Sequence, residues 1–280
     1  MRRLGEVVRL SGGYLERHAS PTPRLDAELL IGHALGLARI DLYVHHDRPL
    51  TEPELASVRA LLERRAAREP VAYILGSWGF RGLTLAVDRR VLVPRPETEQ
   101  LVDLCLDLMG GAEAASVLDV GTGSGAIALA LKAERPGWAV AGSDASTGAL
   151  AVAAANGEAL GLEVEWLAGD LLEPAAGRTF DLIVSNPPYI AQAEIDALEP
   201  EVRDWEPRAA LVAGSAGTEV LERLAAGAPA VLAAGGRLAV ECGAGQAGVV
   251  AGVMGSAGWS GVEVRSDFAG VERFVCGERP

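Results

Sequence analysis

The tetrapeptide Asn186-Pro187-Pro188-Tyr189 holds the residue types best suited to chemistry in this 280-residue chain. It follows the apolar run Phe180-Asp181-Leu182-Ile183-Val184, which is typical of a buried strand. Proline fixes φ and donates no backbone hydrogen bond, so the strand must end here with free carbonyl acceptors. An aromatic ring can stack on a planar –NH2 group while fixed acceptors hold its two hydrogens. The tetrapeptide therefore predicts methylation of an amide or exocyclic amine nitrogen, although alone it also fits a simple Pro-Pro turn.

Each residue of this tetrapeptide has an expected role. Asn186 Oδ1 and the Pro187 carbonyl would each accept one N–H of the target nitrogen, which orients that nitrogen toward the methyl donor. Tyr189 would stack on the amide plane and exclude water, with Phe80 or Trp78 as further candidates for stacking. No strong base is needed, because the nitrogen sheds a proton readily once it is methylated.

A glycine-rich turn, Val117-Leu118-Asp119-Val120-Gly121-Thr122-Gly123-Ser124-Gly125, is the second chemical feature. Such a turn lets a ligand approach backbone N–H groups at the start of a helix. Gly125 lies one position earlier than a dinucleotide fingerprint requires. The carboxylate of Asp119 would repel a pyrophosphate but attract an ammonium or sulfonium group. S-adenosylmethionine carries both groups and no phosphate, so it is the expected cofactor.

Two further acids follow the next two predicted strands. Asp144 is placed to accept both hydroxyls of an adenosine ribose, and Asp170 with Leu171 to flank the adenine ring. Each acid alone also fits a solvated loop or a helix cap, but together with the tetrapeptide they favour a methyltransferase. The predicted cofactor residues are Asp119, Gly121, Thr122, Gly123, Ser124, Gly125, Asp144, Asp170, Leu171 and Asn186.

The elements that must position these residues form a βαβ pattern after Gly110-Gly111. The strands are predicted at Ser116–Val120, Ala139–Ser143, Val164–Ala168, Phe180–Ser185, Gly236–Glu241, Val262–Arg265 and Arg273–Cys276. The helices between them are predicted at Ala126–Ala133, Thr147–Leu160, Thr218–Leu232 and Gln246–Ser256. Continuous apolar strands alternating with helices indicate an α/β fold with a parallel sheet covered on both faces.

The region before this pattern divides in two. Residues 1–75 are predicted to be helical, with a helix at Leu25–Leu35 closed by Gly36 and a capping box at Thr51-Glu52-Pro53-Glu54. Residues 76–95 change to a period of two and predict a β-hairpin that links to a catalytic domain at 96–280. The catalytic domain is predicted to begin with a helix from Glu97 to Met109, capped by Thr98 or a neighbouring residue.

Composition excludes several classes of function. A formal net charge of −13 argues against salt-driven binding to nucleic acid or an anionic membrane. The cysteines, Cys105, Cys242 and Cys276, form no Cys-x-x-Cys pair and fit buried reduced thiols. All four histidines lie in the helical region, so no metal site is expected. Without a signal-like apolar segment near Met1, we expect a cytoplasmic protein.

Four segments resemble the release-factor glutamine N5-methyltransferases of the HemK type. They are Gly79–Leu83, Val91–Glu99, Leu118–Ala128 and Val184–Ile190. The glycine loop is general to S-adenosylmethionine enzymes, and the Asn-Pro-Pro-Tyr box is shared by amino-methylating enzymes of several kinds. The segment Pro94-Arg95-Pro96-Glu97-Thr98-Glu99 is the specific one, and the likeness covers essentially the whole chain.

The resemblance implies a fold, a substrate and a partner. The fold is a Rossmann-like, seven-stranded methyltransferase domain whose last strand is antiparallel, with a helical N-terminal domain that grips the substrate. The substrate is the glutamine of the Gly-Gly-Gln loop in class I peptide-chain release factors, and a monomer without direct nucleic-acid or membrane contact is expected. Arg95 and Glu97 either hold the linker by an ion pair or line the pocket with Phe80 beside the glutamine; the pocket is the favoured alternative.

Other functions remain as alternatives at this point. The same box would serve an N5-glutamine methyltransferase of ribosomal protein L3, although that family carries a different sequence at 96–99. It would also serve a nucleic-acid adenine N6-methyltransferase, which would need a basic surface. A non-catalytic S-adenosylmethionine-binding protein is an alternative from a different class, and a dinucleotide dehydrogenase is more distant.

Overall fold

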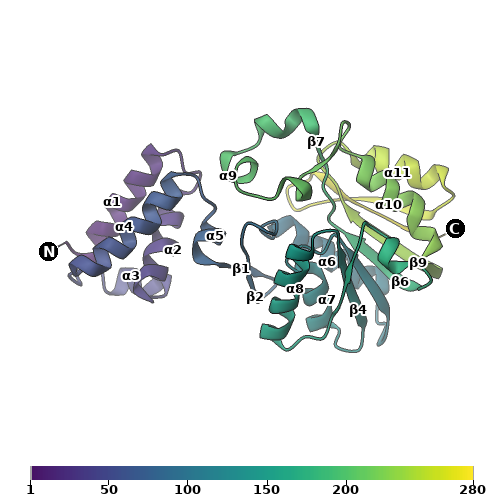
Figure 1. Cartoon of the computed structure of the whole chain (residues 1–280), viewed down its shortest axis with the longest axis horizontal. Helices are drawn as coiled ribbons and strands as arrows, with labels where there is room; N and C mark the ends of the chain where they lie inside the picture. The colour runs from purple at the N-terminus through teal and green to yellow at the C-terminus, as the bar shows by residue number, and fades with distance from the viewer. Residues whose placement is uncertain (1, 280) are drawn as a thin grey trace. The chain divides into compact units, whose positions relative to one another are not determined.

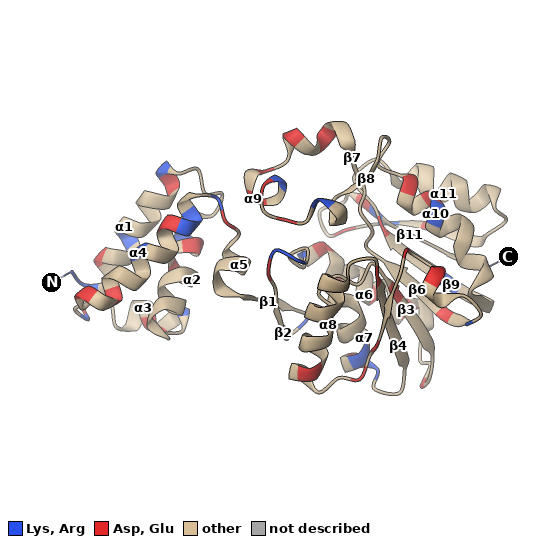
Figure 2. Cartoon of the chain, viewed as in Figure 1, with Lys and Arg blue, Asp and Glu red and all other residues tan. Residues whose placement is uncertain are grey.

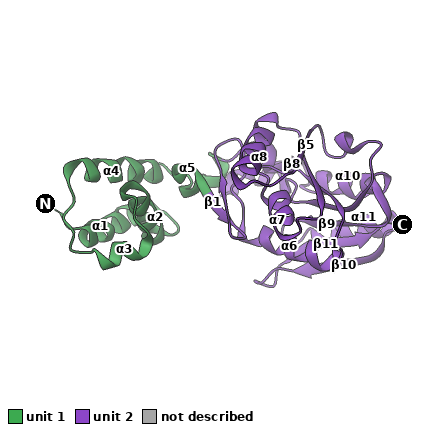
Figure 3. Ribbon diagram, turned by 90° about the horizontal axis from the view of Figure 1, so that it is seen from below, with its two compact units in different colours: residues 1–77, 199–205 green, residues 78–198, 206–280 purple. Residues whose placement is uncertain are grey.

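The computed structural model describes residues 2–279 and divides them into two compact units (Figure 3). Unit 1 comprises residues 1–77 and 199–205, and unit 2 comprises residues 78–198 and 206–280. This differs from the predicted boundaries in two ways. The hairpin region from residue 78 onward belongs to unit 2, and a short segment from the catalytic half of the sequence belongs to unit 1.

Unit 1 is helical. Its helices are α1 (Leu4–Arg17), α2 (Pro23–Leu35), α3 (Arg39–Val44), α4 (Glu52–Ala66), α5 (Val71–Leu75) and α9 (Pro200–Arg203) (Figure 1). The predicted capping box is confirmed: Glu54 N donates to Thr51 Oγ1 at 3.4 Å and Thr51 N donates to Glu54 Oε2 at 2.8 Å. The predicted end of α2 is also confirmed, because Gly36 adopts φ +64°, a left-handed conformation that favours glycine.

A buried ion network holds the returning segment within unit 1. Arg65 is 3% exposed, and it donates to Asp26 Oδ2 and to Glu201 Oε1 at 2.7 Å each. Arg68 also pairs with Glu201. A buried guanidinium requires such partners, since an unpaired buried charge is strongly destabilising. Glu201 therefore fixes residues 199–205 to the helices of unit 1.

Unit 2 contains the α/β elements. Its first part holds β1 (Ser77–Phe80, which begins at the unit boundary), β2 (Leu83–Ala86), α6 (Pro96–Met109), β3 (Ser116–Val120), α7 (Ala126–Glu134), β4 (Ala139–Asp144), α8 (Thr147–Leu160) and β5 (Glu165–Ala168). Its second part holds β6 (Phe180–Ser185), β7 (Ile190–Ala191), β8 (Val212–Gly214), α10 (Glu219–Gly227), β9 (Leu232–Glu241), α11 (Ala247–Ser256), β10 (Ser260–Ser266) and β11 (Glu272–Glu278). Short 3₁₀ turns occur at Glu173–Ala175, Gln192–Ala197, Arg208–Ala210 and Ala228–Ala230.

The main sheet has seven strands in the order β10-β11-β9-β6-β3-β4-β5. Strands β9, β6, β3, β4 and β5 run parallel, and β11 is antiparallel to both of its neighbours. The predicted seven-stranded fold with an antiparallel last strand is thus confirmed. The predicted helix Thr218–Leu232 is shorter than expected, because its last turn contains Pro229, which lacks an N–H, and Leu232 already pairs with Phe180 in the sheet.

Helices cover both faces of this sheet. On one face α6 and α7 pack on apolar side chains of β3, β6 and β9, and the fully buried Phe80, Leu85 and Trp138 join that cluster. On the other face α10 and α11 pack on Leu118, Ile183 and Val240. The two apolar layers hold the parallel strands in register, which brings their carboxyl ends to one edge of the sheet.

Charged residues are interspersed over both units. Figure 2 shows Lys and Arg scattered among Asp and Glu, with no element of the described chain that is predominantly basic. Within residues 2–279, no helix combines the length and apolar character needed to cross a bilayer.

Candidate active site

The carboxyl ends of β3 and β6 bring the glycine turn and the tetrapeptide to the same edge. Val120 pairs with Ser185 at the last register position of the two strands, and Ser185 Oγ donates to the Val120 carbonyl at 2.6 Å. Gly121 and Asn186 are the residues that directly follow β3 and β6. Two segments that lie 65 residues apart in sequence therefore leave the sheet side by side.

The glycine turn is shaped to receive a ligand. Gly121 and Gly123 adopt φ +72° and +55°, and an added Cβ at either position would meet no atom within 4 Å. Positive φ favours glycine, and the missing side chains leave the backbone approachable. The N–H groups of Gly121 and Thr122 both donate to the Ser143 carbonyl, at 2.8 and 2.9 Å, which ties the turn to β4.

Asp119 lies beneath this turn and is 0% exposed. Its Oδ2 accepts the Thr122 hydroxyl at 2.6 Å and the Ala128 N–H at 3.2 Å, so it holds the turn to the start of α7. Its Oδ1 is buried and has no hydrogen-bond partner among the described residues. Burial raises the pKa of Asp119 to about 7, against the lowering effect of the Thr122 hydroxyl.

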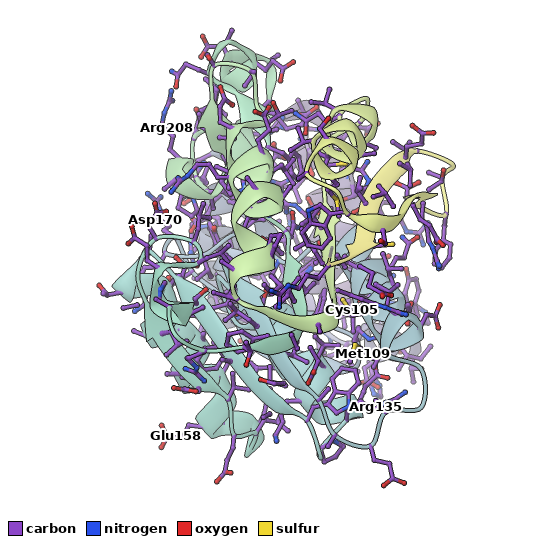
Figure 4. All side chains as sticks on the ribbon, turned by 90° about the vertical axis from the view of Figure 1, so that its right-hand side faces the viewer. Cys105, Met109, Arg135, Glu158, Asp170 and Arg208 are labelled. Carbon is purple, nitrogen blue, oxygen red and sulfur yellow. The ribbon has the colours of Figure 1, made fainter. Side chains whose placement is uncertain are left out.

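The other two acids predicted to bind the cofactor, Asp144 and Asp170, differ in their contacts. Asp144 ends β4, where its Oδ2 accepts the Gly123 N–H at 3.0 Å and its Oδ1 accepts the Ser146 N–H at 2.8 Å. It is therefore part of the same turn. Asp170 is exposed and pairs with Arg223 at 2.5 Å, and Figure 4 shows it at the outside of the unit. The half-buried Leu171 follows it with φ +48°.

The Asn-Pro-Pro-Tyr box presents two free acceptors. Asn186 is half-buried, and its Nδ2 donates to Thr98 Oγ1 at 3.0 Å. Pro187 is buried. Among residues 2–279, no group donates a hydrogen bond to Asn186 Oδ1 or to the Pro187 carbonyl oxygen. A target –NH2 group can supply the two donors that these oxygens lack.

Tyr189 completes the box and is held through its backbone. Gln246 Nε2 donates to the Tyr189 carbonyl at 2.8 Å, while Gln246 Oε1 accepts the Gly243 N–H at 2.9 Å. The ring is half-buried, and burial raises the pKa of its hydroxyl to about 12, so the phenol stays neutral. Gln246 could not be identified as a site residue from the sequence, because a glutamine at the start of a helix carries no distinctive signal.

Thr98 and Glu241 were also missed as site residues. Thr98 is 4% exposed, and its hydroxyl donates to Glu241 Oε2 at 2.8 Å instead of capping α6, whose N-cap is Arg95. Glu241 ends β9, one residue after the Val240–Ser185 pair, so it lies level with Asn186. The signal was present in the sequence: a lone acid ends the strand that follows the tetrapeptide strand.

The other three predicted substrate residues, Phe80, Arg95 and Glu97, differ in their environments. Phe80 is 1% exposed and packs in the core with Leu85, so the expectation that it stacks on the target amide is wrong. Arg95 donates to both oxygens of the buried Glu206 at 2.8 Å, which agrees with the ion-pair alternative, and its role in the pocket stays a prediction. Glu97 is half-buried, and its role stays a prediction.

Taken together, these residues fit S-adenosylmethionine. The open glycine backbone, the Asp144 carboxylate and the unsatisfied Asp119 oxygen provide acceptors and negative charge for a cationic ligand with ribose hydroxyls. In the part of the chain that the structure describes, no group of three metal-ligating side chains lies together.

Comparison with protein families gives two matches. Residues 6–76 match the PrmC N-terminal domain, and residues 100–200 match the methyltransferase small domain. The first match covers most of unit 1, and the second covers the glycine turn and the Asn-Pro-Pro-Tyr box.

Solved structures share the methyltransferase fold. A methyltransferase from Pyrococcus furiosus has a TM-score of 0.55 at 18% identity and covers 79% of this chain and 97% of its own. A 16S rRNA methyltransferase of T. thermophilus, in complex with AdoMet and guanosine, has a TM-score of 0.53 at 20% identity, covering 73% of this chain and 50% of its own.

Sequence relatives are much more similar. The release factor glutamine methyltransferase of Geobacter sulfurreducens is 45% identical over 97% of this chain and 95% of its own. Those of Rhodospirillum rubrum and Deinococcus radiodurans are 47% and 41% identical, over 99% of this chain and 85% and 99% of theirs. With identity at this level over its whole length, the chain belongs to the release factor glutamine methyltransferase family.

Proposed function

We propose that this protein methylates the side-chain amide nitrogen, N5, of the glutamine in the Gly-Gly-Gln loop of class I peptide-chain release factors. S-adenosylmethionine supplies the methyl group from its sulfonium. Near full-length similarity to relatives named release factor glutamine methyltransferases supports the substrate class. The free acceptors of the Asn-Pro-Pro-Tyr box support the choice of an amide nitrogen as the target.

The chemistry follows from those acceptors. An amide nitrogen is a poor nucleophile, because its lone pair is delocalised into the carbonyl. Asn186 Oδ1 and the Pro187 carbonyl can each accept one N–H, which orients the nitrogen and increases its electron density. In this proposal the half-buried Tyr189 ring stacks on the amide plane and excludes water. Positioning, not acid–base catalysis, provides most of the acceleration.

One observation carries this proposal. Two oxygen atoms without hydrogen-bond donors lie directly beyond β6, adjacent to the open glycine turn beyond β3. An oxygen pair of this kind matches the two hydrogens of a primary amide or amine. The glycine turn beside it matches a methyl donor whose positive charge the neighbouring carboxylates favour.

Radiolabelled S-adenosylmethionine tests the substrate. The protein is incubated with each class I release factor, either wild type or with the loop glutamine replaced by asparagine. Label should enter the wild-type release factor alone. Label in both forms, or labelling of ribosomal protein L3 or DNA instead, would show that the substrate is different.

The Asn186→Ala variant tests the role of Asn186 as an acceptor for the target nitrogen. It removes one acceptor, so methyl transfer should be abolished while S-adenosylmethionine still binds with nearly wild-type affinity by calorimetry. Ser266→Ala, at the far end of β10, serves as a control with an unchanged rate. Near-normal turnover of Asn186→Ala would refute the mechanism.

The proposal also includes how the protein meets its substrate and where it acts. The helical unit 1 contacts the release factor, and the protein acts as a cytoplasmic monomer that does not bind nucleic acid directly. The net charge of −13 and the scattered basic residues support the last point. Light scattering should give the mass of one chain, and binding to ribosomal RNA at low salt would contradict the proposal.

A further inference from the structure

Thr98 and Glu241 form a hydrogen-bonded chain with the Asn186 side chain. We propose that these two buried residues are positioning residues, which fix the orientation of the Asn186 amide so that its oxygen faces the target nitrogen. This inference rests on the proposed function, because it concerns the same site. It adds two residues, on α6 and β9, to the machinery that the tetrapeptide alone supplies.

The geometry links three elements through one hydroxyl. Asn186 Nδ2 donates to Thr98 Oγ1 at 3.0 Å, and Thr98 Oγ1 donates to Glu241 Oε2 at 2.8 Å. Thr98 and Glu241 are 4% and 1% exposed, so water does not compete for these bonds. Thr98 lies in the first turn of α6, and its backbone N–H donates to the Arg95 carbonyl at 3.1 Å. Its position is therefore set by the helix start.

The direction of the bonds follows from counting protons. A hydroxyl has one proton, and an ionised carboxylate accepts hydrogen bonds but cannot donate them. The proton of Thr98 must therefore point to Glu241, which leaves a lone pair of the Thr98 oxygen facing Asn186. That lone pair requires a donor, so the amide must place its –NH2 group against Thr98.

The consequence appears on the opposite side of the amide. With Nδ2 committed to Thr98, Asn186 Oδ1 points away as a free acceptor. If the amide were turned by 180°, its –NH2 group would face the –NH2 group of the target, and two donors cannot hydrogen-bond to each other. The Thr98–Glu241 pair thus selects the one amide orientation that can hold the target nitrogen.

The charges around Glu241 make this selection depend on pH. Burial raises the pKa of Glu241 to about 7, and Glu97 adds to the rise, while the Thr98 hydroxyl, Arg273 and Arg95 oppose it. Below that pH the carboxyl can donate its proton to Thr98, and the hydroxyl proton is then free to turn toward Asn186.

Two further neighbours have titratable side chains, Tyr189 and Cys242. Their pKa values are raised to about 12 and about 11, mainly by burial, so both stay neutral throughout this range. Protonation of Glu241 therefore removes the preference for the productive orientation. Methyl transfer should decline as the pH falls through about 7, apart from any effect on cofactor binding.

Substitution of Thr98 tests the inference. Thr98→Val keeps the shape and removes the hydroxyl, and Thr98→Ser restores the hydroxyl. Thr218→Val is the matched control, because the Thr218 hydroxyl donates to Glu222 Oε1 at 2.6 Å in the same unit without touching Asn186. Methyl transfer to the release factor is measured at saturating substrates from pH 6 to 9, with cofactor affinity from calorimetry.

The expected results separate positioning from simple structure. Thr98→Val should lower kcat about 10-fold or more and flatten its pH profile, with cofactor affinity unchanged, since a small misplacement of a positioning group can cost about 100-fold. Thr98→Ser should recover kcat to within about 3-fold and keep the wild-type profile. A Thr98→Val enzyme within about 3-fold of wild type, or one that keeps the wild-type pH profile, would overturn the inference. Inactivity of the wild-type enzyme would instead refute the proposed function.

A second readout does not depend on activity. In ¹⁵N-resolved NMR spectra, the side-chain amide protons of Asn186 should show a contact to the Thr98 methyl group, and Asn186→Asp assigns them by their absence. In Thr98→Val this amide should lose its downfield, hydrogen-bonded shift. An unchanged Asn186 amide signal in Thr98→Val would overturn the inference even if the rate had fallen.

Discussion

Replacing Asn186 by aspartate separates the geometry of the acceptor from its charge. Aspartate is nearly isosteric and still offers an oxygen to the target nitrogen. Asn186→Asp nevertheless places a second carboxylate beside the buried Glu241. The two hydrogen bonds through Thr98 measure 3.0 and 2.8 Å, so the terminal atom at position 186 and Glu241 Oε2 lie at most about 6 Å apart.

The magnitude follows from Coulomb's law. Two unit charges about 6 Å apart repel by about 2.8 kcal/mol at an effective dielectric constant of about 20. This corresponds to about 2 pKa units, or a factor of about 100 in the population in which both groups are ionised. Near pH 7.5 the pair shares one proton, so the hydrogen-bond direction through Thr98 is no longer defined. We therefore expect Asn186→Asp to lower kcat by about 100-fold at this pH.

A double variant shows whether charge is responsible. Glu241→Gln removes the negative charge but keeps an oxygen that can accept the Thr98 hydroxyl. Single-turnover methyl transfer should be at least about 10-fold faster in Asn186→Asp/Glu241→Gln than in Asn186→Asp, because the repulsion is gone. A wild-type rate in Asn186→Asp, or no recovery in the double variant, would refute the reasoning.

Three further predictions address the cofactor, stability and pH. Asp144→Ala should weaken S-adenosylmethionine binding by about 10- to 100-fold in calorimetry, as expected for charged hydrogen bonds to the ribose, and unchanged affinity would count against that role. Arg65→Ala should lower the free energy of unfolding by about 3–5 kcal/mol in urea titrations, because it leaves a buried carboxylate unpaired. The control variant Arg64→Ala, at a half-exposed arginine, should lower it by less than about 1 kcal/mol. Equal losses in the two variants would contradict this prediction. Burial raises the pKa of Asp119 and of Glu241 to about 7, so the folded state binds their protons more tightly than the unfolded state does. The free energy of unfolding of the ligand-free protein should therefore fall as the pH rises from about 5 to about 7.5. Urea midpoints that rise over this interval would show that these carboxyls do not control stability there.

The buried parallel strands of the catalytic unit could be predicted because they are apolar runs bounded by turn residues. The helix Thr147–Leu160 and the strands Ser116–Val120 and Phe180–Ser185 have the predicted bounds. Their carboxyl ends then had to meet at one edge, which brought Asn186 and the glycine turn together. Local patterning was enough here, because buried parallel strands have a strong sequence signal.

Contacts between distant segments could not be predicted in this way. Glu241 meets Thr98 across 143 residues. The acid at the end of a predicted strand was a signal for Glu241 alone, and no local pattern pairs it with Thr98. The return of residues 199–205 to unit 1 depends on Glu201 meeting Arg65, 136 residues away. The prediction for Phe80 was wrong for a related reason. An aromatic residue in a hairpin fits a stacking role or a core position equally well, and only the packing of α6 decides between them.

A crystal structure with S-adenosylhomocysteine and a release factor tests the central claim most directly. The side-chain nitrogen of the loop glutamine should lie within about 3 Å of both Asn186 Oδ1 and the Pro187 carbonyl oxygen, the ordinary length of such hydrogen bonds. A glutamine nitrogen bound away from these two oxygens, or an Asn186 amide that turns its –NH2 group toward the substrate, would contradict the account.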